Sequence, residues 1–168
     1  MENQRFAIRL AEYSDIEEIR RIYNHAITNT VATFDLEEKE FVEMSHWFKD
    51  HDEDHPILVL TSGRLVKGWA SLSPLYKRAA YARSAEISIY LDPENKGKGY
   101  GKALMEALIE RAQKNSFHTL VSRIAGGNQA SFKLHERYNF THQGTLKETG
   151  FKFGKFIDVE IFQLMIDS

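Results

Sequence analysis

The sequence of 168 residues contains no cysteine. Disulfide bonds, thiolate metal sites and a cysteine acyl-enzyme are therefore excluded. The chain also lacks a run of about 18 apolar residues, the length needed to span a membrane. Neither sign of charge is in large excess, because 22 basic and 24 acidic residues give a net charge of −2. No general field then favours nucleic acid or an anionic membrane, so we expect a cytoplasmic protein that binds neither.

The sequence does contain enough apolar material for one packed domain. Apolar residues make up 42% and aromatic residues 12% of the chain, which is typical of a globule with its own core. The length suits a single domain over residues 1–168, and neither an internal repeat nor a low-complexity linker interrupts it.

Periodicity predicts a mixed α/β order of elements. Apolar runs predict strands at residues 6–10, 56–61, 65–73, 85–91, 119–124, 141–148 and 153–166. Helical spacing predicts a helix after a Ser14–Glu17 capping box and a second helix after Asp35. A third helix is expected at about residues 99–115, with Leu104, Leu108 and Ala112 buried, and a fourth at 128–138 with Asn128 as its N-cap.

The most informative segment is residues 87–108, in which an apolar strand passes through three glycines into an amphipathic helix. The glycines are Gly97, Gly99 and Gly101, and three lysines surround them: Lys96, Lys98 and Lys102. Glycines here let backbone N–H groups point at an anion, and the positive end of the helix dipole adds to the attraction. The segment predicts a diphosphate site. The alternative is a glycine-rich turn that only caps the helix.

Two common nucleotide motifs do not fit this segment. G-x-G-x-x-G fails because its last position holds lysine, and G-x-x-x-x-G-K-[ST] does not occur in the chain. Residues 96–101, KGKGYG, instead resemble the acetyl-CoA pyrophosphate loop Q/R-x-x-G-x-G/A of the GNAT N-acetyltransferases, with Lys96 in place of Gln or Arg. Downstream, Asn128–Phe140 resembles the family's N-x-x-S-x-x-L-Y/H-x-x-L-G-F segment, with Tyr138-Asn139 in place of Leu-Gly.

The resemblance narrows to the phosphinothricin acetyltransferase branch, which is similar over nearly the whole chain. The matching segments are Ile22–Ala26, Thr30–Phe34, Glu86–Leu91, Leu134–Glu136 and Gly144–Leu146, followed by Gly150, Gly154 and Asp158. This resemblance implies a GNAT fold, in which a mixed, mostly antiparallel central sheet is flanked by helices and splayed between its fourth and fifth strands. It also implies acetyl-CoA as co-substrate, no metal, and a homodimer.

The implied reaction is direct transfer of acetyl, in a ternary complex, to the α-amine of a phosphinothricin, methionine sulfoximine or methionine sulfone type of acceptor. Residues 73–82, which should line the acceptor pocket, match the branch only loosely. Other acceptors therefore stay open, namely a protein N-terminus or lysine, or a polyamine. A non-catalytic acyl-CoA-binding protein is the alternative from another class.

Two residues are candidates for the chemistry. Glu86 stands near the strand end that would face the acceptor, where a partly buried carboxylate has a raised pKa and can take the amine's proton. The alternative to this catalytic role is that Glu86 is an ordinary strand residue paired with Arg83 or Arg78. His135 occupies the position at which many GNAT enzymes carry a tyrosine thought to protonate the departing thiolate, and histidine suits proton transfer near neutral pH. The alternative to this role is that His135 is a helix residue held by a nearby carboxylate.

The resemblance also assigns the residues that bind acetyl-CoA. They are Ile89, Tyr90, Leu91, Gly97, Lys98, Gly99, Tyr100, Gly101, Lys102 and Asn128. A backbone N–H within residues 89–91 would stabilise the oxyanion, and losing such a donor costs about 3 kcal/mol of transition-state stabilisation. Asn128 would cap its helix and also bind the pantetheine arm, although a cap worth about 1 kcal/mol needs no ligand.

The acceptor side is less well defined. Three basic residues, Lys77, Arg78 and Arg83, are candidates for binding an acceptor carboxylate, because guanidinium recognises it at two points. A solvated basic loop is the equal alternative, and by family analogy Phe34 and Tyr81 wall the same pocket. His51 and His55 have i, i+4 spacing but lie in an acidic stretch before a proline, which favours a solvated loop over a metal site.

Overall fold

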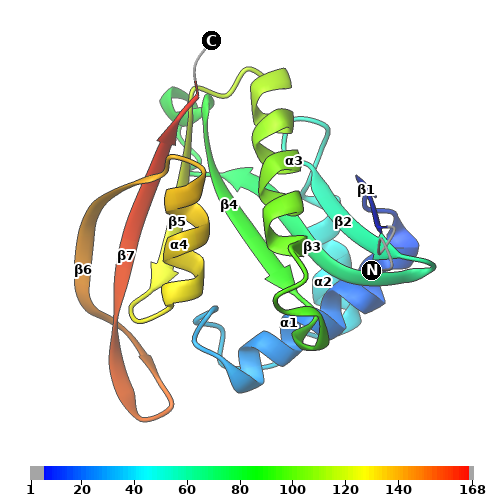
Figure 1. The fold of residues 1–168 in the computed structure, drawn as a ribbon, viewed down its shortest axis with the longest axis horizontal. Coiled ribbons are helices and arrows are strands. Elements are labelled where there is room, and N and C mark those ends of the chain that lie inside the picture. Colours follow the sequence, from blue (N-terminus) through cyan, green and yellow to red (C-terminus); the bar gives the residue numbers. More distant parts are fainter. Residues whose placement is uncertain (1–5, 167–168) are drawn as a thin grey trace.

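The structure, a computed structural model, describes residues 6–166. Its strands are β1 (Phe6–Leu10), β2 (Ile57–Ser62), β3 (Leu65–Pro74), β4 (Ser84–Leu91), β5 (Thr119–Ala125), β6 (Thr141–Lys152) and β7 (Lys155–Met165). Its α-helices are α1 (Ile16–Asn29), α2 (Phe41–Lys49), α3 (Tyr100–Lys114) and α4 (Gln129–Arg137) (Figure 1). Within these residues, no helix is both long and apolar enough to cross a membrane.

All strands join one sheet in the order β1-β2-β3-β4-β5-β7-β6. Neighbouring strands are antiparallel except β4 and β5, which are parallel. The parallel pair is short, because Ser84–Glu86 pairs with Thr119–Val121 and the strands then diverge (Figure 1). This confirms the predicted α/β fold, a mixed and mostly antiparallel sheet splayed between its fourth and fifth strands.

Helices cover both faces of the sheet, and each face has its own core. The α3 face buries Leu104, Leu108 and Ala112, as predicted, against Leu72, Ala85, Ile87 and other sheet residues. The α1 and α2 face buries Ile16, Ile19, Ile22 and Met44 against Val59, Val66 and Trp69. Side chains alternate along β4, so Tyr90 packs on the α1 face while Ile87 packs under α3.

Two local predictions are wrong. The Ser14–Glu17 capping box does not form, because Asp15 holds that turn. Its carboxylate accepts a hydrogen bond from the Glu12 amide at 2.7 Å and two from the Arg9 guanidinium at 2.6 and 2.9 Å. The last hairpin also turns later than predicted. Register shifts extend β6 to Lys152, and the chain reverses at Phe153 and Gly154, both with positive φ.

Candidate active site

A cavity of about 1100 Å³ lies where β4 and β5 diverge. The second half of β4, the end of α1, the turn before α3 and the segment from β5 into α4 line it. It brings together both predicted catalytic residues, Glu86 and His135, with nine of the residues predicted to bind acetyl-CoA: Ile89, Tyr90, Leu91, Gly97, Gly99, Tyr100, Gly101, Lys102 and Asn128. Sequence-distant segments therefore meet in one space.

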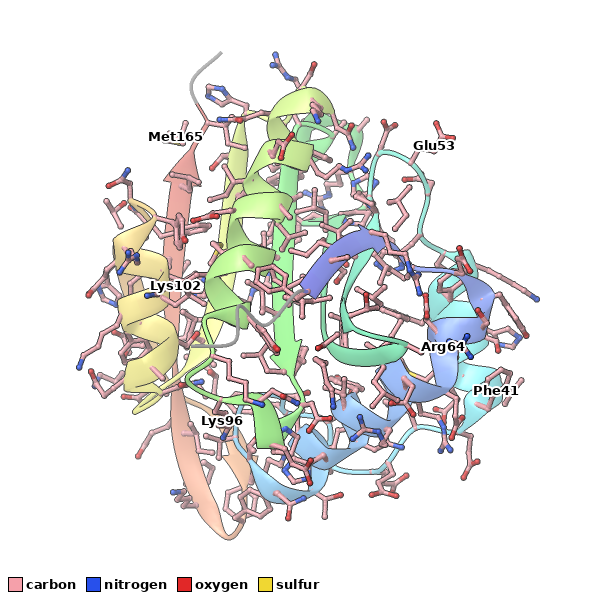
Figure 2. All side chains as sticks on the ribbon, turned by 45° about the vertical axis from the view of Figure 1, so that its right-hand side comes forward. Phe41, Glu53, Arg64, Lys96, Lys102 and Met165 are labelled. Atoms are coloured by element: carbon pink, nitrogen blue, oxygen red, sulfur yellow. The ribbon has the colours of Figure 1, made fainter. Side chains whose placement is uncertain are left out.

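The glycine turn forms one end of this cavity. Gly97 and Gly99 have φ values of 79° and 82°, a left-handed conformation that glycine adopts without steric cost. A Cβ built on either residue meets no atom within 4 Å, so the turn leaves open space beside the backbone. Lys96 and Lys102 lie on either side of the turn (Figure 2) and line the cavity, whereas Lys98 donates to Asn95 Oδ1 at 2.8 Å and does not line it.

The α3 helix begins directly after Gly99, so its first N–H groups have no intrahelical acceptor. These amides and the positive end of the helix dipole face an anion placed at the turn. This geometry is compatible with the predicted diphosphate site, which stays a prediction.

The open edge of β4 supplies further backbone groups. One edge of residues 87–91 pairs with β3, but β5 has left the other edge beyond Glu86. Alternate N–H and C=O groups of this stretch consequently have no strand partner and line the cavity. They can bind the polar groups of an extended ligand that lies between the two strands.

Glu86 lines the cavity at the point where the strands part. Burial raises the pKa of its carboxyl above the ordinary value, and the Arg123 guanidinium offsets part of that rise. Arg123 Nη1 donates to Glu86 Oε2, so the ion-pair partner is neither Arg83 nor Arg78. Sequence reasoning missed Arg123 because only the parallel pairing of β4 with β5 brings these two residues together.

His135 is 4% exposed and packs against Phe140, with ring centroids 5.0 Å apart. Its Nδ1 lies 2.7 Å from the Ser131 carbonyl oxygen. Because a carbonyl only accepts, Nδ1 carries the proton of the neutral ring, and Nε2 keeps a lone pair with no partner among residues 6–166. Burial lowers the pKa of His135, which favours this neutral form. Its hydrogen-bond partner is a carbonyl rather than a carboxylate.

A loop between α1 and α2 is anchored over the sheet by Tyr90, which is predicted to bind acetyl-CoA, and by Lys152, which sequence reasoning did not single out. Tyr90 Oη donates to the Ala32 carbonyl at 3.2 Å, and burial raises the pKa of Tyr90 to about 12, so the hydroxyl keeps its proton. Lys152, buried in β6, donates to the Thr33 carbonyl at 2.8 Å. The strand that lines the cavity is thus fastened to this loop.

Phe34 is held by Gly150 of β6. A Cβ built on Gly150 would lie 2.3 Å from Phe34 Cε2, so the ring occupies the place of a side chain. We expect Gly150→Ala to lower the free energy of unfolding by about 1–3 kcal/mol, the usual result of overpacking. Urea unfolding measures it. Gly144→Ala is the matched control on the same strand, because nothing lies within 4 Å of that Cβ.

Phe34→Leu removes the ring atoms with which the new methyl group collides. The additional loss caused by Gly150→Ala should therefore shrink in the Phe34→Leu background. An equal loss in both backgrounds would show that the ring does not limit Gly150.

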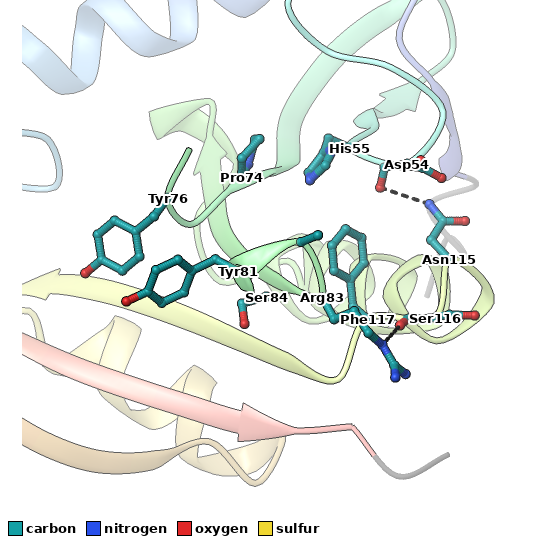
Figure 3. A pocket seen from close by; sticks show the side chains of 11 residues that line it. Asp54, His55, Pro74, Tyr76, Tyr81, Arg83, Ser84, Asn115, Ser116 and Phe117 are labelled. Carbon is teal, nitrogen blue, oxygen red and sulfur yellow. Dashed lines mark hydrogen bonds between the residues drawn. The ribbon is translucent and has the colours of Figure 1, made fainter. Parts of the chain in front are cut away.

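None of the five residues predicted to bind the acceptor lines the large cavity. Tyr81 and Arg83 line a smaller cavity of about 340 Å³ near the start of β4, beside Tyr76, His55 and Phe117 (Figure 3). Arg83 Nε donates to the Ser116 carbonyl at 3.1 Å. Lys77 and Arg78 are exposed in the loop before β4 and line neither cavity. Their roles stay predictions.

The two spaced histidines have separate partners. The sequence predicts that His51 lies in a solvated loop, but its side chain is half-buried against Trp47. Its Nδ1 lies 2.7 Å from the Trp47 carbonyl oxygen. His55 contacts Asp52. In the described part of the chain, no group of three or more His, Asp or Glu side chains could hold a metal ion.

Comparison with known proteins places this arrangement in a family. The Acetyltransferase (GNAT) domain family matches residues 8–161. The chain is 34% identical over 163 residues to the L-methionine sulfoximine/L-methionine sulfone acetyltransferase of Pseudomonas aeruginosa, covering 96% of this chain and 95% of that protein. It is 33% identical over 153 residues to the phosphinothricin N-acetyltransferase of Streptomyces coelicolor, covering 89% and 90%.

A solved structure of an acetyltransferase has the same fold. A GNAT superfamily phosphinothricin acetyltransferase from Sinorhizobium meliloti, in complex with acetyl-CoA, matches with a TM-score of 0.92 at 34% identity, covering 96% of this chain and 88% of that one. The family match spans most of the sheet and both ends of the cavity. The chain therefore belongs to the GNAT family of acetyltransferases.

Proposed function

We propose that this acetyltransferase transfers acetyl from acetyl-CoA to the α-amine of a small amino-acid-like acceptor of the phosphinothricin, methionine sulfoximine or methionine sulfone type. The observation that carries the proposal is the single cavity that joins the glycine turn to Glu86 along the open edge of β4. The names of the two relatives described above support this class of acceptor.

The residues present fit acetyl-CoA, which supplies an activated acetyl thioester. The amides around Gly97 and Gly99 would bind its diphosphate, with Lys96 and Lys102 adding charge. The backbone of residues 89–91 would bind the pantetheine arm and the thioester oxygen. Asn128 Oδ1 caps α4 by accepting from the Ser131 amide at 3.2 Å, which leaves the Asn128 NH₂ group to donate to the arm.

Two side chains would move protons in this mechanism. An acceptor ammonium loses one proton to Glu86, and the freed lone pair then forms the C–N bond while the C–S bond breaks and leaves its electrons on sulfur. The nitrogen loses a second proton, and the thiolate gains one. We assign that proton to His135, because its neutral ring keeps an Nε2 lone pair that is buried and has no partner among residues 6–166. We therefore assign His135 as a shuttle rather than as an acid protonated beforehand.

A thiol-release assay tests the function against a panel of amino acids, sulfoximine, sulfone and phosphinic analogues, polyamines and peptides. We expect release of CoA with an α-amino acid analogue, together with the mass of one acetyl group added to its amine. Release only with peptides or polyamines would favour the alternative acceptors. Binding of acetyl-CoA without turnover on any amine would favour a non-catalytic acyl-CoA-binding protein and overturn the proposal.

The cytoplasmic location and the homodimer stay predictions. Exposed aromatic side chains support the homodimer: Phe151, Phe153 and Phe156 on the β6–β7 hairpin are 57%, 57% and 65% exposed. Apolar side chains gathered at one exposed place are typical of an interface between proteins. We propose this hairpin as the contact between two copies of the chain.

A further inference from the structure

Arg123 is a charged residue of the cavity that the proposed chemistry leaves without a role. It lies on β5, two residues beyond Val121, which forms the last pair with β4. Its side chain is 37% exposed and lines the cavity beside Glu86. Its guanidinium also lies 5.8 Å from the ring centroid of Tyr76, a cation–π contact that fixes its direction.

The hydrogen bonding of this pair is incomplete. Arg123 donates one of its five N–H groups to Glu86, and the other four find no acceptor among residues 6–166. Glu86 in turn accepts from no other group in the described chain. A partly exposed ion pair of this kind contributes little to stability, about 0–1 kcal/mol. The unused donors and lone pairs are therefore available to a ligand.

Other cations are less well placed for the acceptor. Arg83 uses its Nε on the Ser116 carbonyl and lines the smaller cavity (Figure 3). Arg78 lines neither cavity. Lys155 and Arg137 also line the large cavity, but among residues 6–166 only Arg123 forms an ion pair with Glu86, the carboxylate assigned to the amine.

The following proposal rests on the proposed function and concerns the residue by which the enzyme selects its acceptor. We propose that Arg123 is a specificity-determining residue that binds the carboxylate of the acceptor while Glu86 binds the ammonium group. An α-amino acid carries these two opposite charges on one carbon atom, and the Glu86–Arg123 pair presents the matching charges in contact. Two-point recognition of a carboxylate is what a guanidinium does best.

The pairing also links acceptor binding to proton transfer. Without a ligand, Arg123 holds down the pKa that burial raises on Glu86. A bound carboxylate shares the positive charge of Arg123, so the Glu86 carboxylate becomes a stronger base when the amine is in place. Other ionisable groups that line the cavity are His25, Lys96, Lys102, Lys133, Arg137 and Lys155, together with His135, Tyr90 and Tyr100.

The test compares L-methionine sulfone with its amide, which keeps the amine but lacks the carboxylate. At pH 8.5 we expect wild type to prefer the acid. Arg123→Gln should lower kcat/KM for the acid by about 10- to 100-fold, mainly through KM, and change the value for the amide by less than about threefold. Arg123→Lys should restore part of the preference. Arg64→Gln, in an exposed turn, is the control.

A pH profile adds a readout that a purely structural role would not move. Arg123→Gln removes the positive charge that lowers the Glu86 pKa, so the acidic limb of kcat/KM should move to higher pH for both acceptors. An equal loss for acid and amide at pH 8.5 would overturn the assignment to the carboxylate. Loss of the preference in Arg83→Gln instead would assign the carboxylate to the smaller cavity.

Binding separates failure of this inference from failure of the proposed function. Calorimetry measures the affinity of the same acid and amide for the complex of the protein with CoA, which needs no turnover. Preference for the acid in wild type and its loss in Arg123→Gln support the inference. Turnover without such preference would leave the acetyltransferase proposal standing and overturn the role of Arg123. A binding preference for the acid without any turnover would overturn only the proposed acetyl transfer.

Discussion

Glu86→Gln is expected to lower kcat by about 100- to 10,000-fold, the range over which a positioned proton acceptor accelerates a reaction. The amide keeps the size of the side chain and can accept from Arg123, but it cannot take a proton from an ammonium. Steady-state thiol release measures kcat, and calorimetry with CoA should show an unchanged Kd. Glu110→Gln is the matched control, because that carboxylate pairs with Lys114 on the exposed side of α3.

The same residue fixes the sign of the pH dependence. Burial raises the pKa of Glu86, and only the ionised carboxylate can act as the base. The kcat/KM value should therefore rise with pH through a pKa above 4.5, the ordinary value of a glutamate. That limb should be absent from the residual activity of Glu86→Gln. Full activity in this variant, or an unchanged acidic limb, would remove Glu86 from the proposed mechanism.

Gly99→Ala is expected to weaken CoA binding by about 10- to 100-fold, the loss that follows when one hydrogen bond to a charged group is broken. The φ of 82° strains any residue with a Cβ, and the new methyl group would enter the open space at the proposed diphosphate site. Isothermal calorimetry with CoA measures the affinity, and thermal unfolding measures the strain.

A second glycine separates strain from ligand contact. Gly63, in the turn between β2 and β3, has a φ of 62° and likewise no atom within 4 Å of its Cβ, but it does not line the cavity. Gly63→Ala should lose stability as Gly99→Ala does, by about 1 kcal/mol, and keep the wild-type Kd for CoA. Equal affinities in the two variants would place the diphosphate elsewhere.

Local patterns in the sequence were enough for the order of elements and for the two motifs. The turn before α3 depends on backbone conformation, so its closely spaced glycines predict it directly. The spacing of apolar residues along α3 likewise predicts which side of the helix is buried. The exceptions are local as well. Asp15 replaced the expected cap because Arg9 is close in space, and bulges displaced the last hairpin by a few residues.

The acceptor side could not be read in the same way. Arg123 reaches Glu86 only because β5 lies parallel to β4 and then diverges from it. Arg83, three residues before Glu86 in the sequence, faces the smaller cavity instead. Phe34 meets Gly150 through the packing of a loop on a distant hairpin. Contacts between distant segments depend on strand pairing and on packing, which no short pattern contains.

The sequence by itself determined the family, the glycine turn before α3 and the chemical types available for proton transfer, because each of these is encoded in contiguous residues. Only the tertiary structure decided which charges share a cavity and which tautomer His135 adopts. The reason is physical. Charge pairing, burial and hydrogen bonding act through distances of a few ångströms in space, and those distances exist only once the sheet has formed.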